Sequence, residues 1–291
     1  VSGRQDSPAP GLSPCMAAAV SVAAADGSAV SIVDIDGTPR VTKTGAANTA
    51  GMNSAAKTEY EANFQAGVAK AVQAVRAASP HADVLDALND AGRLIRSTSA
   101  RGGTVFLEDS GLQDIQPLNF TEPGQLEALP ADVVTFLAGQ QEVPDLTGVT
   151  VVLVGIGDTA PPQPPLGIGL QNHLRAIWTA IIKAGGGRVE TDPYPRQNPA
   201  PAHVPTVSLV KVPALRTWPG PSTGASLPLP DTGPVGFEPN TAQFRDPSAA
   251  RKALGEIAGY LLDNPGARIV LTGTTAHFEG CLLYTSPSPR D

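Results

Sequence analysis

Apolar residues along the first 212 positions follow two patterns, and together they predict a layered α/β fold. Continuous or β-branched apolar runs, typical of buried strands, fall at 29–36, 104–107, 149–156, 188–191 and 206–212. Helix-compatible runs fall between them, at 14–25, 54–78, 82–96, 130–137 and 168–184. Because strands alternate with helices, we expect a largely parallel sheet joined by right-handed crossovers.

The clearest helical pattern lies at 168–184. Apolar residues recur there at three- and four-residue steps and form one face, made of Leu170, Leu174, Ile177, Trp178 and Ile181. The glycines at 185–187 follow this face and predict the end of the helix. In the first strand region, the Asp36-Gly37 pair followed by the segment 41–43 predicts a hairpin turn.

Two Pro-rich stretches, 192–205 and 213–234, interrupt the second half of the chain. The second stretch is the longer one, it also contains Gly, Ser and Thr, and it follows the last predicted strand. We therefore expect it to be an extended linker. The prediction is an N-terminal α/β domain at 1–212 and a Pro-rich linker at 213–234.

Residues 235–273 predict one further unit, in the order strand, helix, strand. The first strand is expected at 235–237. Asp246-Pro247 is a typical helix start, with Asp at the cap and Pro in the first turn. The apolar face of this helix consists of Ala250, Leu254, Ile257 and Leu261. Asn264-Pro265-Gly266 predicts its end, and the second strand is expected at 268–273.

In the order of its elements and in its residue pattern, this region resembles the OmpA-like domain, the peptidoglycan-associated module of OmpA and MotB-type proteins. The resemblance is carried by 235–240, 249–265 and 267–275, little more than half of such a domain. The whole chain also resembles OmpA-family proteins that place an α/β domain before this module. The resemblance implies a non-enzymatic, membrane-associated, extracytoplasmic protein of the cell envelope with peptidoglycan as its partner, although no signal or anchor is visible in the sequence.

In the family that this region resembles, an Asp in the turn after the second strand and an Arg on the next helix hold the diaminopimelate of the peptide stem. The ligand's ammonium and carboxylate groups call for such opposite charges. Here Ala276 stands at the position of the Asp. The residues that remain for hydrogen bonding to peptidoglycan are Thr274, Thr275 and His277, and an ordinary strand-ending turn is the alternative interpretation.

The last eleven residues, 281–291, have no apolar periodicity. A DNA string that would encode them resembles a transposon-type sequencing adapter, so we expect them to be an artefactual tail that lies outside the fold. The partial OmpA-like domain is accordingly expected at 235–280.

Asp34-Ile35-Asp36-Gly37-Thr38 offers an alternative function, because it matches the motif of haloacid-dehalogenase-type phosphatases. In those enzymes the two Asp residues act as nucleophile and general acid at a Mg²⁺ site. Such a site also needs a second acidic cluster, and Gly157-Asp158 is followed by Thr-Ala-Pro-Pro rather than another Asp. A hairpin turn explains the motif more simply. Asp109-Ser110 likewise matches the metal-binding motif of von Willebrand A-like domains only weakly.

Composition and charge narrow the range of functions. The net charge of −7 and the lack of a basic run argue against nucleic acid as a partner. The four histidines have no metal-ligand spacing, and we expect neither a metal nor a cofactor. The residues at 155–160 match the sequence motif of dinucleotide-binding loops. That motif requires a helix to follow directly, and the prolines of 161–165 prevent one, so the segment predicts a loop. A protein partner of the N-terminal domain is left unidentified.

Overall fold

The computed structural model describes residues 1–98, 102–196, 198–212, 229, 235–238, 241, 243–263 and 268–271, with no side-chain description for 168, 256 and 258–263. By internal contacts the described chain divides into two units, a larger one at Val1–Val212 and a smaller one within Pro213–Ala276. The two units are described separately below.

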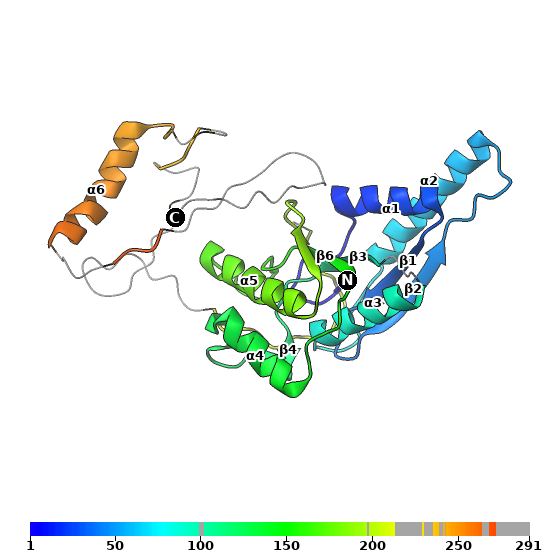
Figure 1. Cartoon of the computed structure of the whole chain (residues 1–291), viewed down its shortest axis with the longest axis horizontal. Helices are drawn as coiled ribbons and strands as arrows, with labels where there is room; N and C mark the ends of the chain where they lie inside the picture. The colour runs from blue at the N-terminus through cyan, green and yellow to red at the C-terminus, as the bar shows by residue number, and fades with distance from the viewer. Residues whose placement is uncertain are drawn as a thin grey trace. The chain divides into compact units, whose positions relative to one another are not determined.

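A three-stranded parallel sheet forms the centre of the larger unit (Figure 1). Its strands are β3 (Gly103–Glu108), β6 (Val149–Val154) and β7 (Arg188–Thr191), in the order β3-β6-β7. The register pairs Val105 with Val151, and Val151 with Val189. The predicted α/β class and the parallel sheet are therefore confirmed.

The central strand β6 is buried on both faces, as its continuous apolar run predicts. Val149, Val151 and Leu153 belong to the main hydrophobic core, whereas Val152 and Val154 pack with Met16 in a separate cluster. This alternation follows from the two-residue period of a strand. Three helices contribute to the main core: α3 (Val84–Thr98), α4 (Pro130–Gln140) and α5 (Ile168–Ala184).

Helix α1 (Pro14–Asp26) covers the opposite face of the sheet through Met16 (Figure 1). Helix α5 contributes Leu174, Ile177 and Trp178 to the main core, so its predicted apolar face is confirmed as the buried one. The indole Nε1 of Trp178 donates to the backbone oxygen of Gly111 at 2.9 Å, which satisfies its one polar group in the core.

A hairpin and a long helix extend the larger unit. Strands β1 (Ala29–Asp34) and β2 (Arg40–Ala46) pair antiparallel, which confirms the predicted hairpin. Helix α2 (Ser54–Gln73) packs against α1, and Val68 and Val72 share a second core cluster with Ile32. Short strands β4 (Asp114–Ile115) and β5 (Leu118–Asn119) and a 3-10 helix, Gln125–Glu127, complete the unit.

The strand predicted at 206–212 is not formed. The side-chain amide of Gln163 replaces a neighbouring strand at this point. Its Oε1 accepts the N–H of Val210 at 2.8 Å, and its Nε2 donates to the carbonyl of the same residue at 3.0 Å. Val210 is thus buried with its backbone satisfied and without a ladder partner.

The smaller unit contains helix α6 (Pro247–Asp263). Its predicted start is confirmed, because the Asp246 carboxylate accepts the N–H groups of Ser248 and Ala249, each at 2.9 Å. Before the helix, Phe237 and Phe244 form an isolated antiparallel bridge, and their rings stack with centroids 4.7 Å apart.

The second strand of the predicted βαβ unit is not formed over its described residues, 268–271. Val270 is 89% exposed and Leu271 is 81% exposed. A strand needs a neighbour to satisfy its backbone groups, and the described residues of this unit provide only the one isolated bridge. Among the described residues, no helix combines the length and the apolar character needed to cross a lipid bilayer.

Candidate functional site

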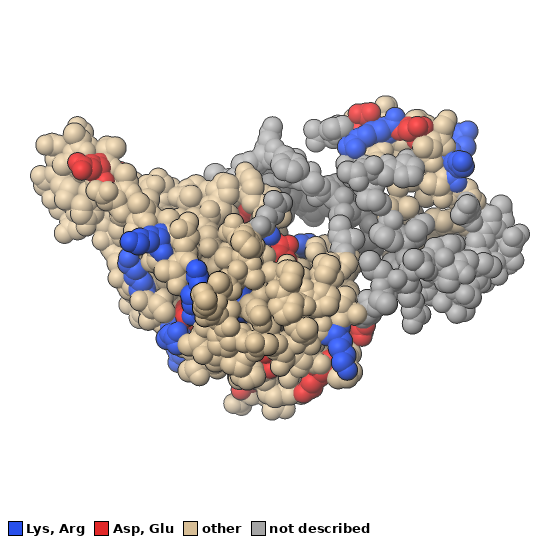
Figure 2. Space-filling view, turned by 180° about the vertical axis from the view of Figure 1, so that it is seen from behind, with Lys and Arg blue, Asp and Glu red and all other residues tan. Residues whose placement is uncertain are grey.

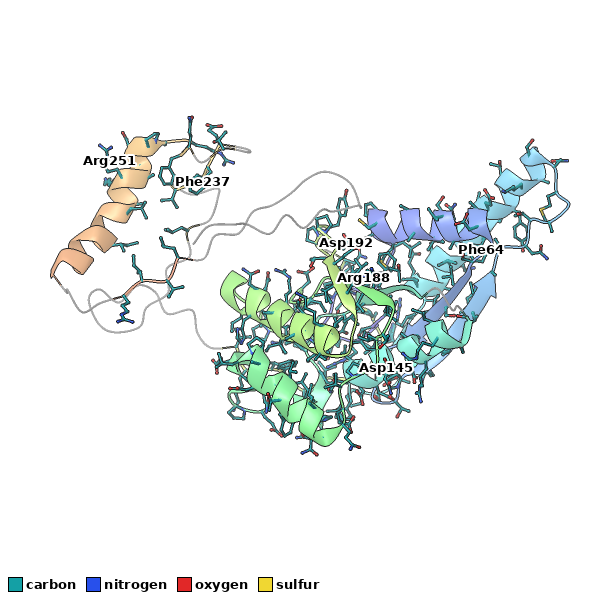
Figure 3. All side chains as sticks on the ribbon, viewed as in Figure 1. Phe64, Asp145, Arg188, Asp192, Phe237 and Arg251 are labelled. Atoms are coloured by element: carbon teal, nitrogen blue, oxygen red, sulfur yellow. The ribbon has the colours of Figure 1, made fainter. Side chains whose placement is uncertain are left out.

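Polar residues gather where the three parallel strands end. Glu108 is the last residue of β3, Gly155 follows β6, and Asp192 follows β7 (Figure 3). Parallel strands present their carboxyl ends at one edge of the sheet, and ligands of layered α/β proteins commonly bind beyond that edge. This edge is therefore the candidate functional site.

A cavity of about 170 Å³ lies between the ends of β6 and β7 and the start of α5. Its polar lining consists of Asp158, Gln171, Arg175, Thr191, Asp192 and Tyr194. Gly155 contributes backbone, and the apolar part of the wall comes from Leu153, Ile156, Pro193 and Pro195. A small cavity with several convergent polar groups is suited to orienting a small ligand.

The loop after β6 forms one wall of this cavity, and the prediction of a loop at 155–160 is confirmed. Helix α5 begins only at Ile168, so no helix N-terminus follows these glycines directly. Gly155 and Gly157 have φ angles of 70° and 91°, in the left-handed region that favours glycine. The N–H of Gly157 donates to the carbonyl of Ser110 at 2.8 Å, which joins this loop to the end of β3.

Arg196 holds the loop after β6 in place. Its backbone N–H donates to Oδ2 of Asp158 at 2.9 Å, and its Nε lies 3.3 Å from Oε1 of Glu108. The guanidinium also donates to the Ser7 hydroxyl at 2.9 Å and to the carbonyl of Pro8. Burial raises the pKa of Glu108, and the positive charge of Arg196 opposes that shift.

A second buried ionic cluster lies in the same unit. Arg4 is almost completely buried and pairs with Asp6 at 3.2 Å and with Asp114 at 3.6 Å. Burial raises the pKa of Asp6 to about 6, and the charge of Arg4 opposes the shift. Asp114 also accepts the N–H of Ala82 at 2.7 Å and lies 3.3 Å from Nδ1 of His81. These contacts join the N-terminal segment to the β4 region.

The two carboxylates of the cavity differ in how far they are already engaged. Asp192 is buried, its Oδ1 accepts the N–H of Tyr194 at 2.9 Å, and its Oδ2 accepts the Ser13 hydroxyl. Asp158 uses Oδ2 for the backbone of Arg196, and no described residue donates to its Oδ1.

Arg175 is the cation of the cavity. Its Nη1 donates to Oδ1 of Asn172 at 2.9 Å. Among the residues that the structure describes, no carboxylate forms an ion pair with it. Its charge is therefore available to a ligand.

The residues of the phosphatase motif lie at the hairpin. Asp34 ends β1 and lies 3.1 Å from Nη2 of Arg40; burial raises its pKa, and Arg40 opposes that shift. Burial would raise the pKa of Asp36 too, but hydrogen bonds from the Ser79 hydroxyl and nearby N–H groups, first Ala78, leave that pKa below its usual value. Asp36 thus fastens the segment after α2 to the hairpin turn.

The other candidate site residues from the sequence either make structural hydrogen bonds or lie outside the described residues. Oδ1 of Asp109 accepts the N–H of Gly111 at 2.5 Å and so closes the turn that follows β3. Thr274, Thr275 and His277, the predicted peptidoglycan-binding residues, lie outside the described residues. Within the described ranges, no group of three or more His, Cys, Asp or Glu side chains is arranged to hold a metal ion.

Comparisons with known proteins gave no relative. No family model matches the chain. Likewise, no similar protein was found among curated proteins or among solved structures. The candidate site therefore rests on its geometry alone.

The sequence pattern did not indicate Arg175 or Arg196 as site residues. Arg175 lies four residues after Gln171 on α5, a spacing that places both residues on one side of the helix. This spacing is the sequence feature that could have indicated Arg175 as a site residue. Arg196 lies in a Pro-rich stretch without periodicity. Figure 2 shows a largely uncharged face of the described residues, on which Lys, Arg, Asp and Glu are scattered rather than gathered into one patch.

Proposed function

We propose that this chain is a non-enzymatic protein of the cell envelope, located outside the cytoplasm, whose C-terminal part belongs to an OmpA-like, peptidoglycan-associated module. The observation that carries the proposal is the order of features from 235 to 265. An extended segment at Phe237 precedes a helix that begins at Asp246-Pro247 and ends before Asn264-Pro265. The larger α/β unit would then serve a different ligand or a protein partner.

The exposed segment 268–271 supports the proposal that this part of the chain pairs with a further strand. Ile269, Val270 and Leu271 are consecutive apolar residues with a large exposed surface. Covering such residues is worth about 1.5–3 kcal/mol each. A neighbouring strand would provide that cover.

The contacts of the module with peptidoglycan are also a proposal, because they are inferred from the resemblance. Thr274, Thr275 and His277 would hydrogen-bond to the peptide stem of peptidoglycan. Ala276 lacks the carboxylate that this turn has in the resembled family, so the ammonium group of the ligand would need another partner. Binding through this turn alone is expected to be weak.

Sedimentation with purified peptidoglycan sacculi tests the proposal. The samples are this chain and a variant in which Thr274, Thr275 and His277 are replaced by alanine. We expect a small fraction of this chain to sediment with sacculi, digestion of the sacculi with lysozyme to return that fraction to the supernatant, and the variant to stay in the supernatant. Equal sedimentation of the two proteins would refute the assignment.

A further inference from the structure

We propose that the cavity between β6 and β7 binds a small zwitterion of the α-amino acid type, with its carboxylate on Arg175 and its ammonium group on Asp158. Both side chains line the same cavity of about 170 Å³. The site lies in the larger unit and is independent of the peptidoglycan proposal. It would give the α/β unit a ligand of its own.

Arg175 provides the carboxylate end of the site. A guanidinium presents parallel N–H groups that match the two oxygens of a carboxylate. One of its nitrogens, Nη1, is held by Asn172, which fixes the side chain, and no described carboxylate neutralises its charge. A partly buried cation without an ion-pair partner is stabilised by an incoming anion.

Asp158 provides the ammonium end. Its Oδ2 is fixed by the backbone N–H of Arg196, while its Oδ1 has no donor among the described residues. The amide oxygen of Gln171 is a further acceptor on the cavity wall, because the hydrogen bond of this side chain to Leu166 uses Nε2. An ammonium group has three donors, so Asp158 and Gln171 can both accept from it.

The size and the charge of the cavity favour a small zwitterion over other classes of ligand. A dry cavity of about 150 Å³ holds a benzene molecule, so this volume suits a molecule of similar size. Phosphate and other multiply charged anions would meet the carboxylates of Asp158 and Asp192, and Arg175 is the only cation among the described lining residues. Ile156, Pro193 and Pro195 leave room for a short apolar side chain.

The site is held in place before a ligand arrives. Asp192 is fixed by Ser13 and by the backbone of Tyr194, and Arg196 ties the Asp158 loop to Glu108. Groups that are already oriented lose little conformational freedom on binding, which favours affinity for a small ligand.

Isothermal titration calorimetry of the full chain tests the proposal. The probes are glycine, L-alanine and L-serine, with three controls that each change the charge pattern. N-acetyl-L-alanine lacks the ammonium group, L-alaninamide lacks the carboxylate, and L-alanyl-L-alanine carries the two charges farther apart. We expect at least one free amino acid to bind, and each control compound to bind about tenfold to a hundredfold more weakly.

Variants assign the two ends of the ligand. Arg175→Gln and Asp158→Asn should each weaken binding of the amino acid by about tenfold to a hundredfold. Arg188→Gln is the matched control, because Arg188 is exposed at the start of β7, away from the strand ends that line the cavity, and it should leave the affinity unchanged (Figure 3). Thermal unfolding followed by circular dichroism verifies that each variant is folded.

Three results would overturn the inference. The first is that the wild-type chain binds none of the three amino acids. The second is that a control compound binds as tightly as the amino acid, since the paired charges would then be irrelevant. The third is that a folded Arg175→Gln or Asp158→Asn protein binds with wild-type affinity.

Discussion

Arg196 reaches from beyond the end of β7 to Glu108 at the end of β3, where its Nε lies 3.3 Å from Oε1 of the carboxylate. Strand β6 lies between these two strands in the sheet, so the arginine crosses the end of the central strand. It does so at Gly155, where a side chain is missing: a Cβ atom there would lie 2.1 Å from Cδ of Arg196. One arginine and one glycine thereby fasten all three strand ends.

Removing the charge of Arg196 should strongly destabilise the larger unit. In Arg196→Met the stem is largely kept, but Glu108 is left buried without its cation. Breaking such a buried pair costs about 3–5 kcal/mol. Urea unfolding measures the loss, and Arg188→Met, a change at an exposed arginine, should lie within about 0.5 kcal/mol of wild type. Equal values for the two variants would contradict a stabilising role of the pair.

Gly155→Ala should destabilise for two separable reasons. The backbone at this position has a φ of 70°, which costs about 1–2 kcal/mol for a residue with a side chain, and the new methyl group collides with Arg196. In the Arg196→Met background the second cost should shrink, because a flexible methionine can move aside. Gly169→Ala is the matched control, since a Cβ there meets nothing within 4 Å, and it should not destabilise. Equal decreases in the free energy of unfolding for Gly155→Ala and Gly169→Ala would contradict this account.

Local patterns predicted the elements of this fold because their causes are local. The continuous apolar run at 149–156 predicts a strand buried on both faces, and β6 is that strand. The stripe of α5 and the Asp246 cap of α6 depend only on residues a turn apart. The run at 206–212 failed because a remote side chain, Gln163, satisfies the backbone that a neighbouring strand would otherwise have paired.

The candidate site could not be predicted in the same way. Its parts come from segments that are far apart in the sequence, as in the hydrogen bond between Arg196 and Ser7, 189 residues away. Charged residues in loops carry no periodicity, and only the folded chain shows which of them are buried together. The sequence motif at Asp34 and Asp36 drew attention to the hairpin, whereas the cavity lies at the ends of β6 and β7.

Asp6 should make the stability of the larger unit decrease from acidic to neutral pH. Its pKa is raised from 3.8 to about 6 by burial, so the folded state holds the proton more tightly than the unfolded chain. The contribution is complete below about pH 4 and is lost as the pH rises through 6, about 3 kcal/mol in total. Relative to Asp6→Asn, the wild-type free energy of unfolding should therefore decrease over this range.

Urea unfolding at a series of pH values measures that difference. Asp26→Asn, at an exposed position at the end of α1, serves as the control and should follow the wild-type profile. If the Asp6→Asn and wild-type profiles run parallel from acidic to neutral pH, the buried carboxyl group has no role in the pH dependence.

The exposed segment 269–271 should make the chain self-associate. Val270 and Leu271 present adjacent apolar side chains that are 89% and 81% exposed, and an exposed apolar extended segment tends to pair with another chain. Light scattering should show the apparent mass rising with protein concentration. Val270→Lys should reduce this rise, whereas Val22→Lys, at an exposed apolar position on α1, should not. A wild-type chain that stays monomeric at high concentration would contradict the prediction.

Asp36 should behave as a structural residue and not as the general acid of a phosphatase. Its Oδ1 accepts the N–H groups of Gly37 at 2.7 Å and Ser79 at 3.1 Å, and its Oδ2 accepts the N–H of Ala78 at 2.8 Å. Asp36→Ala leaves these donors unpaired, which costs about 1–3 kcal/mol. Burial raises the pKa of Asp36, but hydrogen bonds from the Ser79 hydroxyl and from these N–H groups lower it overall. The stabilisation is therefore present at neutral pH and is lost as the pH falls through that lowered value.

An assay with p-nitrophenyl phosphate and Mg²⁺ separates this role from the phosphatase alternative. We expect no hydrolysis by the wild-type chain, and a lower free energy of unfolding for Asp36→Ala than for Asp34→Asn, because Asp34 has Arg40 as its main partner. The decisive comparison is between activity and folding. Mg²⁺-dependent hydrolysis by wild type that disappears in a fully folded Asp34→Asn protein would make the hairpin a catalytic site and refute the non-enzymatic assignment.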